Sequence, residues 1–417
     1  MRASSGHLPR LNGLLPLCII GLILGWAGVG VTGDVTIIDG IPHVRNGATP
    51  ASGLQTVQVK ELWRAGGEDD EVLFGSIGRV LVDGAGTLYL LDSRLSHVQV
   101  YSPDGTFLRT VSREGDGPGE SRRPSDMFFC SDSALGLIQV FPGKVIKVNR
   151  DGTPAGGMDF SQGDPTQGRF SVLIQGVARG GVLALLGIRM TFSPDGTQNQ
   201  TYFLSRCDDR GAEQHCYVSK QATINYADFV VSEKDMDFVY GRFDLAEDGR
   251  MLVAPDRNRY AIHVFRPDGT LEQVIERQYE SLGRGEPERA RARQTLEAVA
   301  ANYPVKPRES VIMDTEPDIS WVRAAPGGDL WVGTSRGDAN PPTGAMMVVD
   351  VFDREGVFKA QKAFMIPGDA RKDAAFFLGE DRVVVVKGAL DAFLEQQGVA
   401  AQESDESMEI ICYRLLN

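Results

Sequence analysis

Residues 88–105 decide the fold of this chain and read LYLLDSRLSHVQVYSPDG. An apolar strand ends at Asp92, a second strand follows, and an Asp-Gly turn closes the unit at Asp104 and Gly105. Residues 252–269 repeat this order as LVAPDRNRYAIHVFRPDG, and in both copies the two aspartates are twelve positions apart. Such a unit cannot bury its own faces and must stack on copies of itself, so the sequence predicts a repeat architecture.

Six units of this kind can be followed along the chain. The first has strands at residues 77–82, 88–91, 97–101 and 107–112, and four short antiparallel strands form one propeller blade. The sixth unit is one strand short. We expect residues 57–64 to be its missing outer strand, because this pairing closes the ring and removes the free edges. The sequence predicts an all-β fold, a six-bladed β-propeller over residues 57–417, and an open array or two sandwiches are the alternatives.

One segment breaks the β pattern. Residues 286–302 are rich in helix formers, have Pro287 in the first turn and stop before Pro304, which predicts one inserted helix. We expect it to pack on the rim or a face of the propeller, and the alternative is a lid over the central channel.

The repeat carries a family resemblance. Residues 77–105 resemble the NHL-type repeat, in which a strand ends in Asp-Ser and the next strand runs into an Asp-Gly turn. Residues 113–120 with 123–126 resemble the linker between blades in bacterial exported six-bladed β-propeller proteins. The resemblance covers residues 57–130 and 237–275. It implies the fold and export, and it implies no activity, since most members of that family are uncharacterised.

The N-terminus has the pattern of a targeting segment. Arg2 and Arg10 precede an apolar run over residues 14–31, and small residues follow before Asp34. Residues 1–33 are therefore predicted to be a signal peptide, with a retained membrane anchor as the alternative, and residues 34–56 form a short arm. The protein is expected to be extracytoplasmic, either periplasmic or secreted.

Composition and charge exclude some partners. Hydrophobic residues make up 42% of the chain and charged residues 24%, as in an ordinary folded protein. The formal net charge of −13 argues against nucleic acid as a partner. It also argues against docking on an anionic membrane, so membrane contact is expected only through an uncleaved N-terminal segment.

Four cysteines follow the targeting segment. Cys207 and Cys216 flank a turn-like stretch, and export permits disulfides, so this pair is the predicted disulfide. Cys130 and Cys412 lie on apolar strand patterns and are predicted to be buried thiols. No Cys-x-x-Cys spacing for structural zinc is present.

Arginines recur in the loops between the second and third strands of the blades. We expect these loops to gather on one face, with each arginine paired to a nearby aspartate such as Asp92 or Asp256 and holding its loop. The two aspartates are themselves expected to accept backbone N–H bonds. The alternative is an anion-binding surface, because arginine suits carboxylates and phosphates. The loop arginines are Arg94, Arg189, Arg257 and Arg336.

The innermost strands should line a channel that contains polar side chains. Aligning the units places Arg79, Asp126, Gln175, Arg242, Asp244, Asp318 and Arg323 on or near these strands. This mixed set could hold a polar ligand or simply surround water. The histidines fall at no equivalent repeat positions, and no nucleophile motif is present, so no catalytic residue is assigned.

The leading hypothesis is a binding or scaffold module in the cell envelope, recognising a protein, a glycan or a small polar or anionic ligand. No cofactor is expected. The alternative is a metal-dependent lyase or lactonase-type enzyme, in which Asp126, Asp244 and Asp318 would bind a divalent metal in the channel.

Overall fold

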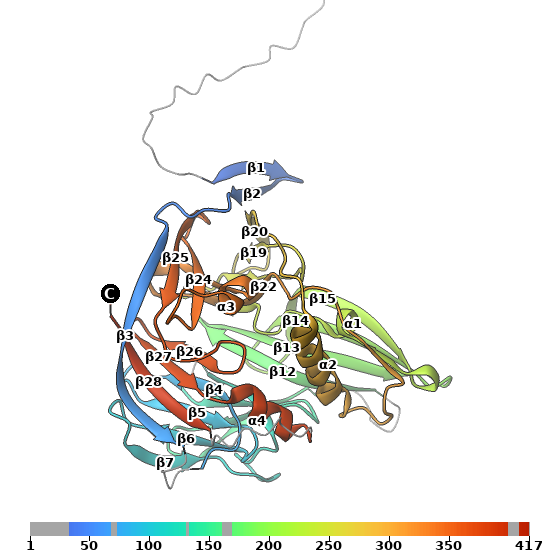
Figure 1. The fold of residues 1–417 in the computed structure, drawn as a ribbon. Coiled ribbons are helices and arrows are strands. Elements are labelled where there is room, and N and C mark those ends of the chain that lie inside the picture. Colours follow the sequence, from blue (N-terminus) through green and yellow to red (C-terminus); the bar gives the residue numbers. More distant parts are fainter. Residues whose placement is uncertain (1–32, 68–72, 131–132, 161–168, 399–407, 417) are drawn as a thin grey trace, which may run out of the picture. The chain divides into compact units, whose positions relative to one another are not determined.

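The computed structural model describes residues 33–67, 73–130, 133–160, 169–398 and 408–416 (Figure 1). The predicted targeting segment thus lies outside the described residues, apart from Gly33. Strands dominate the described part. Within it, no helix is both long enough and apolar enough to cross a membrane.

Four-stranded antiparallel sheets form the first three blades. Their strands are β4 (Ile77–Val82), β5 (Leu88–Asp92), β6 (His97–Tyr101) and β7 (Phe107–Val111); β8 (Pro124–Phe129), β9 (Leu135–Gln139), β10 (Lys144–Val148) and β11 (Pro154–Asp159); and β12 (Arg169–Arg179), β13 (Val182–Phe192), β14 (Thr197–Cys207) and β15 (Glu213–Asn225). The third blade has much longer strands than the repeat predicts. Its β13–β14 hairpin turns at Asp195 and Gly196, so β13 is eleven residues long.

The other three blades follow the same order. Their strands are β17 (Phe243–Leu245), β18 (Met251–Val253), β19 (Ala261–Phe265) and β20 (Leu271–Arg277); β22 (Ile319–Ala324), β23 (Leu330–Thr334), β24 (Met347–Phe352) and β25 (Phe358–Phe364); and β26 (Ala374–Leu378), β27 (Arg382–Val386), β28 (Glu409–Leu416) and β3 (Leu54–Gly66). The inner strands contact one another in the order β4, β8, β12, β17, β22, and β26 contacts β4.

An N-terminal strand closes the ring, as predicted. Residues 58–66 of β3 pair antiparallel with β28, and residues 54–57 pair parallel with β25 (Figure 1). Val57 packs in the core between the fifth and sixth blades, whereas Trp63 and Ala65 pack in the core between the sixth and first blades. β3 is therefore the outer strand of the sixth blade and also holds the fifth.

The Asp-Gly turns of the repeat have a packing reason. Gly105 has φ of 90°, and a Cβ there would lie 2.5 Å from Trp63 on the outer strand of the preceding blade. Gly269 repeats this arrangement, with φ of 92° and His215 at 2.6 Å. Glycine is required at both turns for its backbone conformation and because the neighbouring blade packs directly on it.

The aspartate that follows the first strand of the repeat has different roles in the two copies, Asp92 and Asp256. Asp92 is buried and accepts backbone N–H bonds from Gly75, Ser76, Arg94 and Leu95. It therefore fixes the loop after its strand, as predicted. Asp256 does not: its half-exposed carboxylate lies 3.7 Å from Arg259. The prediction is wrong for the second copy.

The N-terminal arm extends the fourth blade. β1 (Asp34–Ile38) and β2 (Ile41–Asn46) form a hairpin, and β2 pairs parallel with β20. Asn46 anchors the arm, since its side chain donates to Gly356 O at 2.9 Å and accepts from Phe358 N at 2.8 Å.

The inserted helix α2 (Glu286–Ala300) lies where the sequence predicts it. Leu296 and Ala300 pack with Phe229 and Val231, beside the two-stranded sheet of β16 (Val230–Ser232) and β21 (Glu309–Val311). The remaining helical segments are η2 (Tyr226–Asp228), α1 (Glu233–Met236), η3 (Pro326–Gly328), α3 (Ser335–Ala339) and α4 (Ala389–Gln396).

Residues just after α2 contact two opposite blades. The Tyr303 hydroxyl lies 3.2 Å from Gln200 Nε2 in the third blade, and Asn302 Nδ2 donates to Gln397 Oε1, just after α4 of the sixth blade, at 2.8 Å. Because the third and sixth blades lie opposite each other in a six-bladed ring, this segment connects opposite blades at one end of the ring. That end belongs to the face with the loops between second and third strands, called the linker face below; the opposite face is the turn face.

Candidate functional site

The inner strands of all six blades surround a central channel with a cavity of about 730 Å³. Its walls combine apolar side chains such as Trp321 and Phe377 with a few charged groups. Each charged group is carried on or beside a strand that is held on both sides, so its position is set by the sheet.

Arg79 and Asp126 form a complete ion pair in the channel wall. Arg79 donates through Nε to Oδ1 at 2.5 Å and through Nη2 to Oδ2 at 2.8 Å. The buried Asp126 also accepts the N–H groups of Met127 and Gly176. Burial lowers the pKa of Arg79, but the charge and hydrogen bonds of Asp126 raise it overall. This pair is part of the structure of the wall.

Asp244 is also fully engaged. Its Oδ1 accepts from Leu245 N at 2.8 Å and its Oδ2 accepts from Ala324 N at 2.9 Å. Arg179 lies 3.8 Å from the same carboxylate and donates to Leu245 O at 2.6 Å. Asp244 thereby joins the inner strands of the fourth and fifth blades.

Arg323 has a different environment. Its Nη1 donates to the backbone oxygen of Phe377, whereas its buried Nε has no hydrogen-bond partner. Burial lowers the pKa of Arg323 to about 10, because the nearby charges of Arg179 and Arg79 offset the attraction of Asp244. Among the described residues, no carboxylate lies within ion-pair distance of this guanidinium, the only such case among the three channel arginines.

The linker-face end of the channel is acidic. Asp338, on α3, accepts from Ser320 Oγ at 2.9 Å, and burial together with the Asp369 charge raises its pKa to about 7. Asp373 lies nearby and pairs with Lys387 at 2.5 Å. The channel therefore runs from carboxylates at this end to the guanidinium groups of Arg79, Arg179 and Arg323 further in.

Two residues expected at the channel lie elsewhere. Arg242 is buried and binds Asp237 at 2.9 Å and the backbone oxygen of Phe238. Asp318 is buried near Arg257 and Arg336, and burial raises its pKa. The carboxylates Asp126, Asp244 and Asp318 thus do not converge. In the described ranges, no group of three or more His, Cys, Asp or Glu side chains could hold a metal ion.

The loop arginines of the linker face all have acidic partners. Arg257 pairs with Glu233 at 2.7 Å and Asp237 at 3.3 Å. The other partners are Glu395 for Arg94 at 3.4 Å, Glu213 for Arg189, and Glu280 for Arg336 at 3.1 Å. Arg94, Arg257 and Arg336 hold loops. Arg189 lies within β13 and its partner Glu213 within β15, so its predicted loop position is wrong. None of the four partners is Asp92 or Asp256.

The predicted disulfide is not formed. Cys207 and Cys216 are free thiols, the first buried and the second exposed. They lie on neighbouring strands, but Cys207 is opposite Glu213 and Cys216 is opposite Ser205, because the register of β14 and β15 shifts there. Cys130 and Cys412 are buried, as predicted, and burial raises the pKa of Cys412 to about 11.

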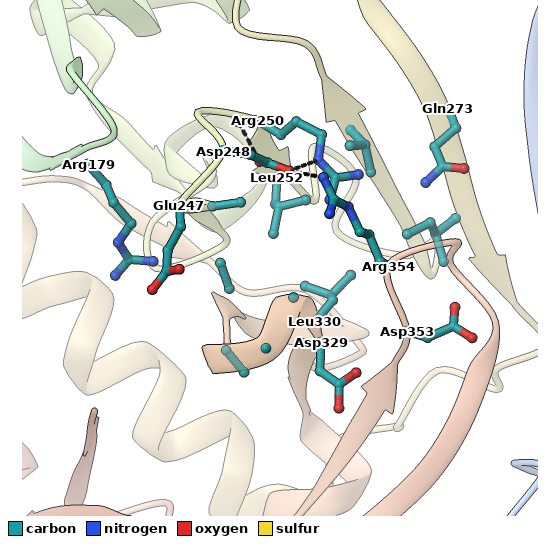
Figure 2. Close-up of a pocket in the computed structure, with 17 residues that line it drawn as sticks. Arg179, Glu247, Asp248, Arg250, Leu252, Gln273, Asp329, Leu330, Asp353 and Arg354 are labelled. Atoms are coloured by element: carbon teal, nitrogen blue, oxygen red, sulfur yellow. Dashed lines mark hydrogen bonds and ion pairs between the residues drawn. The ribbon is translucent and has the colours of Figure 1, made fainter. Parts of the chain in front are cut away.

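A second, smaller hollow lies on the turn face between the fourth and fifth blades. Its volume is about 240 Å³, and Leu252 and Leu330 contribute to an apolar floor. Figure 2 shows Asp248 held between Arg250 and Arg354, at 3.0 and 2.8 Å. Arg179 lines both this hollow and the channel. The hollow is therefore adjacent to the turn-face end of the channel.

Sequence reasoning missed Arg179 and Asp338. Arg179 ends an inner strand of the third blade, where the repeat is weakest, so an alignment of blades could not place it. Asp338 lies on a five-residue helix in a loop, and no sequence signal directs its side chain to the channel.

Comparison with known proteins supports the fold. A family model described as 6-bladed beta-propeller matches residues 68–155. A search of curated proteins finds no match. The family match bears out the repeat that was read from residues 77–105.

Solved structures of similar fold include three with different descriptions. A DUF4221 family member from Bacteroides vulgatus is 10% identical, covers 87% of this chain and 99% of its own, and has a TM-score of 0.47. A calcium-binding regucalcin from Agrobacterium tumefaciens is 11% identical, covers 87% of this chain and 96% of its own, and has a TM-score of 0.43. Virginiamycin B lyase from Staphylococcus aureus is 8% identical, covers 85% of this chain and 99% of its own, and has a TM-score of 0.40.

Because these TM-scores lie below 0.5, no ligand or activity is carried over from those proteins. The family match and the strand order support a narrower statement. The chain is a six-bladed β-propeller protein whose ring is closed by its own N-terminal strand.

Proposed function

We propose that this protein is an exported binding module that holds a small polar ligand in its central channel. The observation that carries the proposal is the cavity of about 730 Å³, within the usual range for small-molecule sites, with a few charged groups on apolar walls. Those groups are held on strands, so the site is formed before any ligand arrives.

The linker face is a weaker candidate than the channel. Its arginines are occupied by Glu233, Glu395, Glu213 and Glu280, so an incoming anion would have to displace a carboxylate at each one. The segment after α2 also connects the third and sixth blades on this face. We therefore infer that a ligand enters from the turn face, past Arg179.

Export rests on the predicted signal segment, and the proposed location is the periplasm or the outside of the cell. The proposal is binding rather than lyase or lactonase chemistry. Asp126 and Asp244 are each committed to backbone amides and an arginine, and Asp318 lies away from them.

A channel-filling variant tests the proposal. Ala375 lines the channel, and Ala375→Trp would fill part of it, whereas Ala212→Trp places the same side chain on an exposed turn. The unfolding temperature of residues 33–417 would be measured with polar small-molecule fractions from the cell envelope. At least one fraction should raise it by several degrees in the native protein and in Ala212→Trp, but not in Ala375→Trp.

Ala178→Trp, in the third-blade wall, serves as a second channel-filling variant if Ala375→Trp fails to fold. If a fraction raised the unfolding temperature of the channel-filling variants as much as that of the native protein, binding would lie outside the channel and the proposal would be contradicted. So would a native protein that no fraction stabilises.

A further inference from the structure

We infer that the channel ligand is an anion whose carboxylate or phosphate group binds Arg323, flanked by Arg179 and Arg79. This inference rests on the proposed function and adds the chemical class of the ligand. It starts from the balance of charge in the inner part of the channel.

Three arginines share two carboxylates there. Asp126 is bound in two-point fashion by Arg79, and Asp244 is bound by two backbone amides with Arg179 at 3.8 Å. Three positive and two negative charges leave one positive charge without a counterion. The contacts assign that charge to Arg323, which donates to the backbone oxygen of Phe377.

The hydrogen bonds of Arg323 lead to the same assignment. A guanidinium has five N–H donors in a fixed planar fork, which matches two oxygens of a carboxylate or phosphate. Among the described residues, Nε of Arg323 is buried without an acceptor. The same holds for Arg257, Arg277 and Arg284, but those guanidinium groups each have a carboxylate partner and Arg323 has none. Leaving a buried charged donor unsatisfied is costly, so an anion that supplied an oxygen would relieve that cost on binding.

The surroundings of Arg323 favour a strong contact. Trp321 and Phe377 line the channel beside it, with their ring centres 5.9 Å apart. Apolar walls reduce the local dielectric constant, so an ion pair formed here is stronger than one at the surface. The cavity has room for an organic molecule behind the anionic group.

Binding of simple anions tests the inference. Inorganic phosphate and succinate would be titrated into residues 33–417 at constant ionic strength, with glycerol as the neutral comparator. The variant is Arg323→Met, and the matched control is Arg113→Met, which removes an exposed arginine paired with Glu120. Native protein and control should bind at least one anion saturably, and Arg323→Met should bind it at least tenfold more weakly.

A second readout separates ligand binding from a purely structural role. Without anion, Arg323→Met should be as stable as the native protein or more stable, because it removes an uncompensated buried charge. Arg323→Lys should bind more weakly than the native protein, since it keeps the charge without the planar fork. Unchanged anion affinity in Arg323→Met, or a destabilised variant that still binds, would overturn the inference.

The two proposals can fail separately. If an envelope fraction stabilises the native protein but not Ala375→Trp, while neither anion binds, the channel is a binding site and the anion inference is wrong. If neither fraction nor anion binds, both are wrong.

Discussion

Arg257 on the linker face and Arg323 in the channel are both partly buried arginines, yet they have different surroundings. Arg257 contacts two carboxylates and the backbone oxygen of Thr315. Arg323 contacts one backbone oxygen and, among the described residues, no carboxylate. Nε lacks a partner in both arginines, so the carboxylates are what distinguish them. An arginine with its own carboxylates stabilises a loop, whereas one without them remains available to a ligand.

The same contrast holds for the two regions as a whole. On the linker face, Glu233 binds Arg257 and Arg284, and Arg284 also binds Glu316 at 2.7 Å. The outer strand β3 and the Asp-Gly turns at Gly105 and Gly269 are likewise fully engaged in contacts within the protein. In the inner part of the channel, Arg323 has no carboxylate partner among the described residues.

The largest effect is expected from removing the outer strand β3, which closes the ring. Deleting residues 57–64 removes most of the strand that pairs with β28, exposing the edge of the sixth blade and the core around Trp63. We expect aggregation or loss of the cooperative unfolding transition, measured by light scattering and by thermal denaturation. Deleting residues 33–38 instead removes only the exposed edge strand β1 and should leave a soluble, folded protein. A soluble, equally stable 57–64 deletion would disprove the closure.

The second prediction concerns a substitution that weakens the network of ion pairs around Glu233 on the linker face. Glu233→Gln removes the negative charge that pairs with Arg257 and Arg284, whose side chains are only 10% and 4% exposed. Removing one partner of a buried ion pair costs about 3 kcal/mol of unfolding free energy, to be measured by urea denaturation at pH 7.

The pH dependence of that loss has a definite sign. Burial raises the pKa of Glu233, but hydrogen bonds from Arg284 and Met313 N and the charges of Arg257 and Arg284 lower it overall. Its stabilising contribution is present above the unfolded pKa of about 4.3 and is lost as the pH falls through the lower folded value. The difference between the two proteins should therefore shrink in acid. A pH-independent difference would argue against an electrostatic cause.

A third prediction concerns the acidic end of the channel. The pKa of Asp338 is raised to about 7, so the folded state retains a proton that the unfolded state releases near pH 4. Native stability relative to Asp338→Asn should fall as the pH rises from 4 to 7 and then remain constant. We expect a difference of about 1 to 2 kcal/mol at pH 8, after allowance for partial solvent screening. Parallel stability curves across this range would contradict the raised pKa.

The smallest effect is expected at an exposed ion pair. Glu280→Gln removes the partner of Arg336 on the linker face, but the Glu280 side chain is 89% exposed. Exposed pairs contribute little, so the unfolding free energy should change by less than about 0.5 kcal/mol. Because Glu233→Gln makes the same chemical change in a buried network, a similar loss in both variants would show that burial does not decide the effect.

Much of the fold was predictable from local sequence. The spacing of Asp92, Asp104 and Gly105 indicates the blade, and the missing strand of the sixth unit points to β3 because a ring leaves no free edge. The third blade was predicted poorly. Its strands continue through a polar stretch around Gln198 and Gln200, which are buried only because other parts of the chain cover them.

The site was less predictable, because partners come from distant parts of the chain. The sequence identifies Arg79, Arg242 and Arg323 as similar inner-strand arginines. It does not reveal that Asp126 binds the first or that Asp237 binds the second. Nor does it reveal that the third has no acidic partner in the described part of the chain. The Cys207–Cys216 prediction failed for a related reason: sequence proximity does not reveal a shift in strand register.

The most direct test compares Arg257→Met with Arg323→Met by urea denaturation in anion-poor buffer. The account predicts opposite results: Arg257→Met should lose about 3 kcal/mol because it leaves Glu233 and Asp237 undercompensated, and Arg323→Met should lose none or gain stability. Comparable losses in both variants would mean that Arg323 is a structural residue, and would contradict the claim that the channel keeps a positive charge for a ligand.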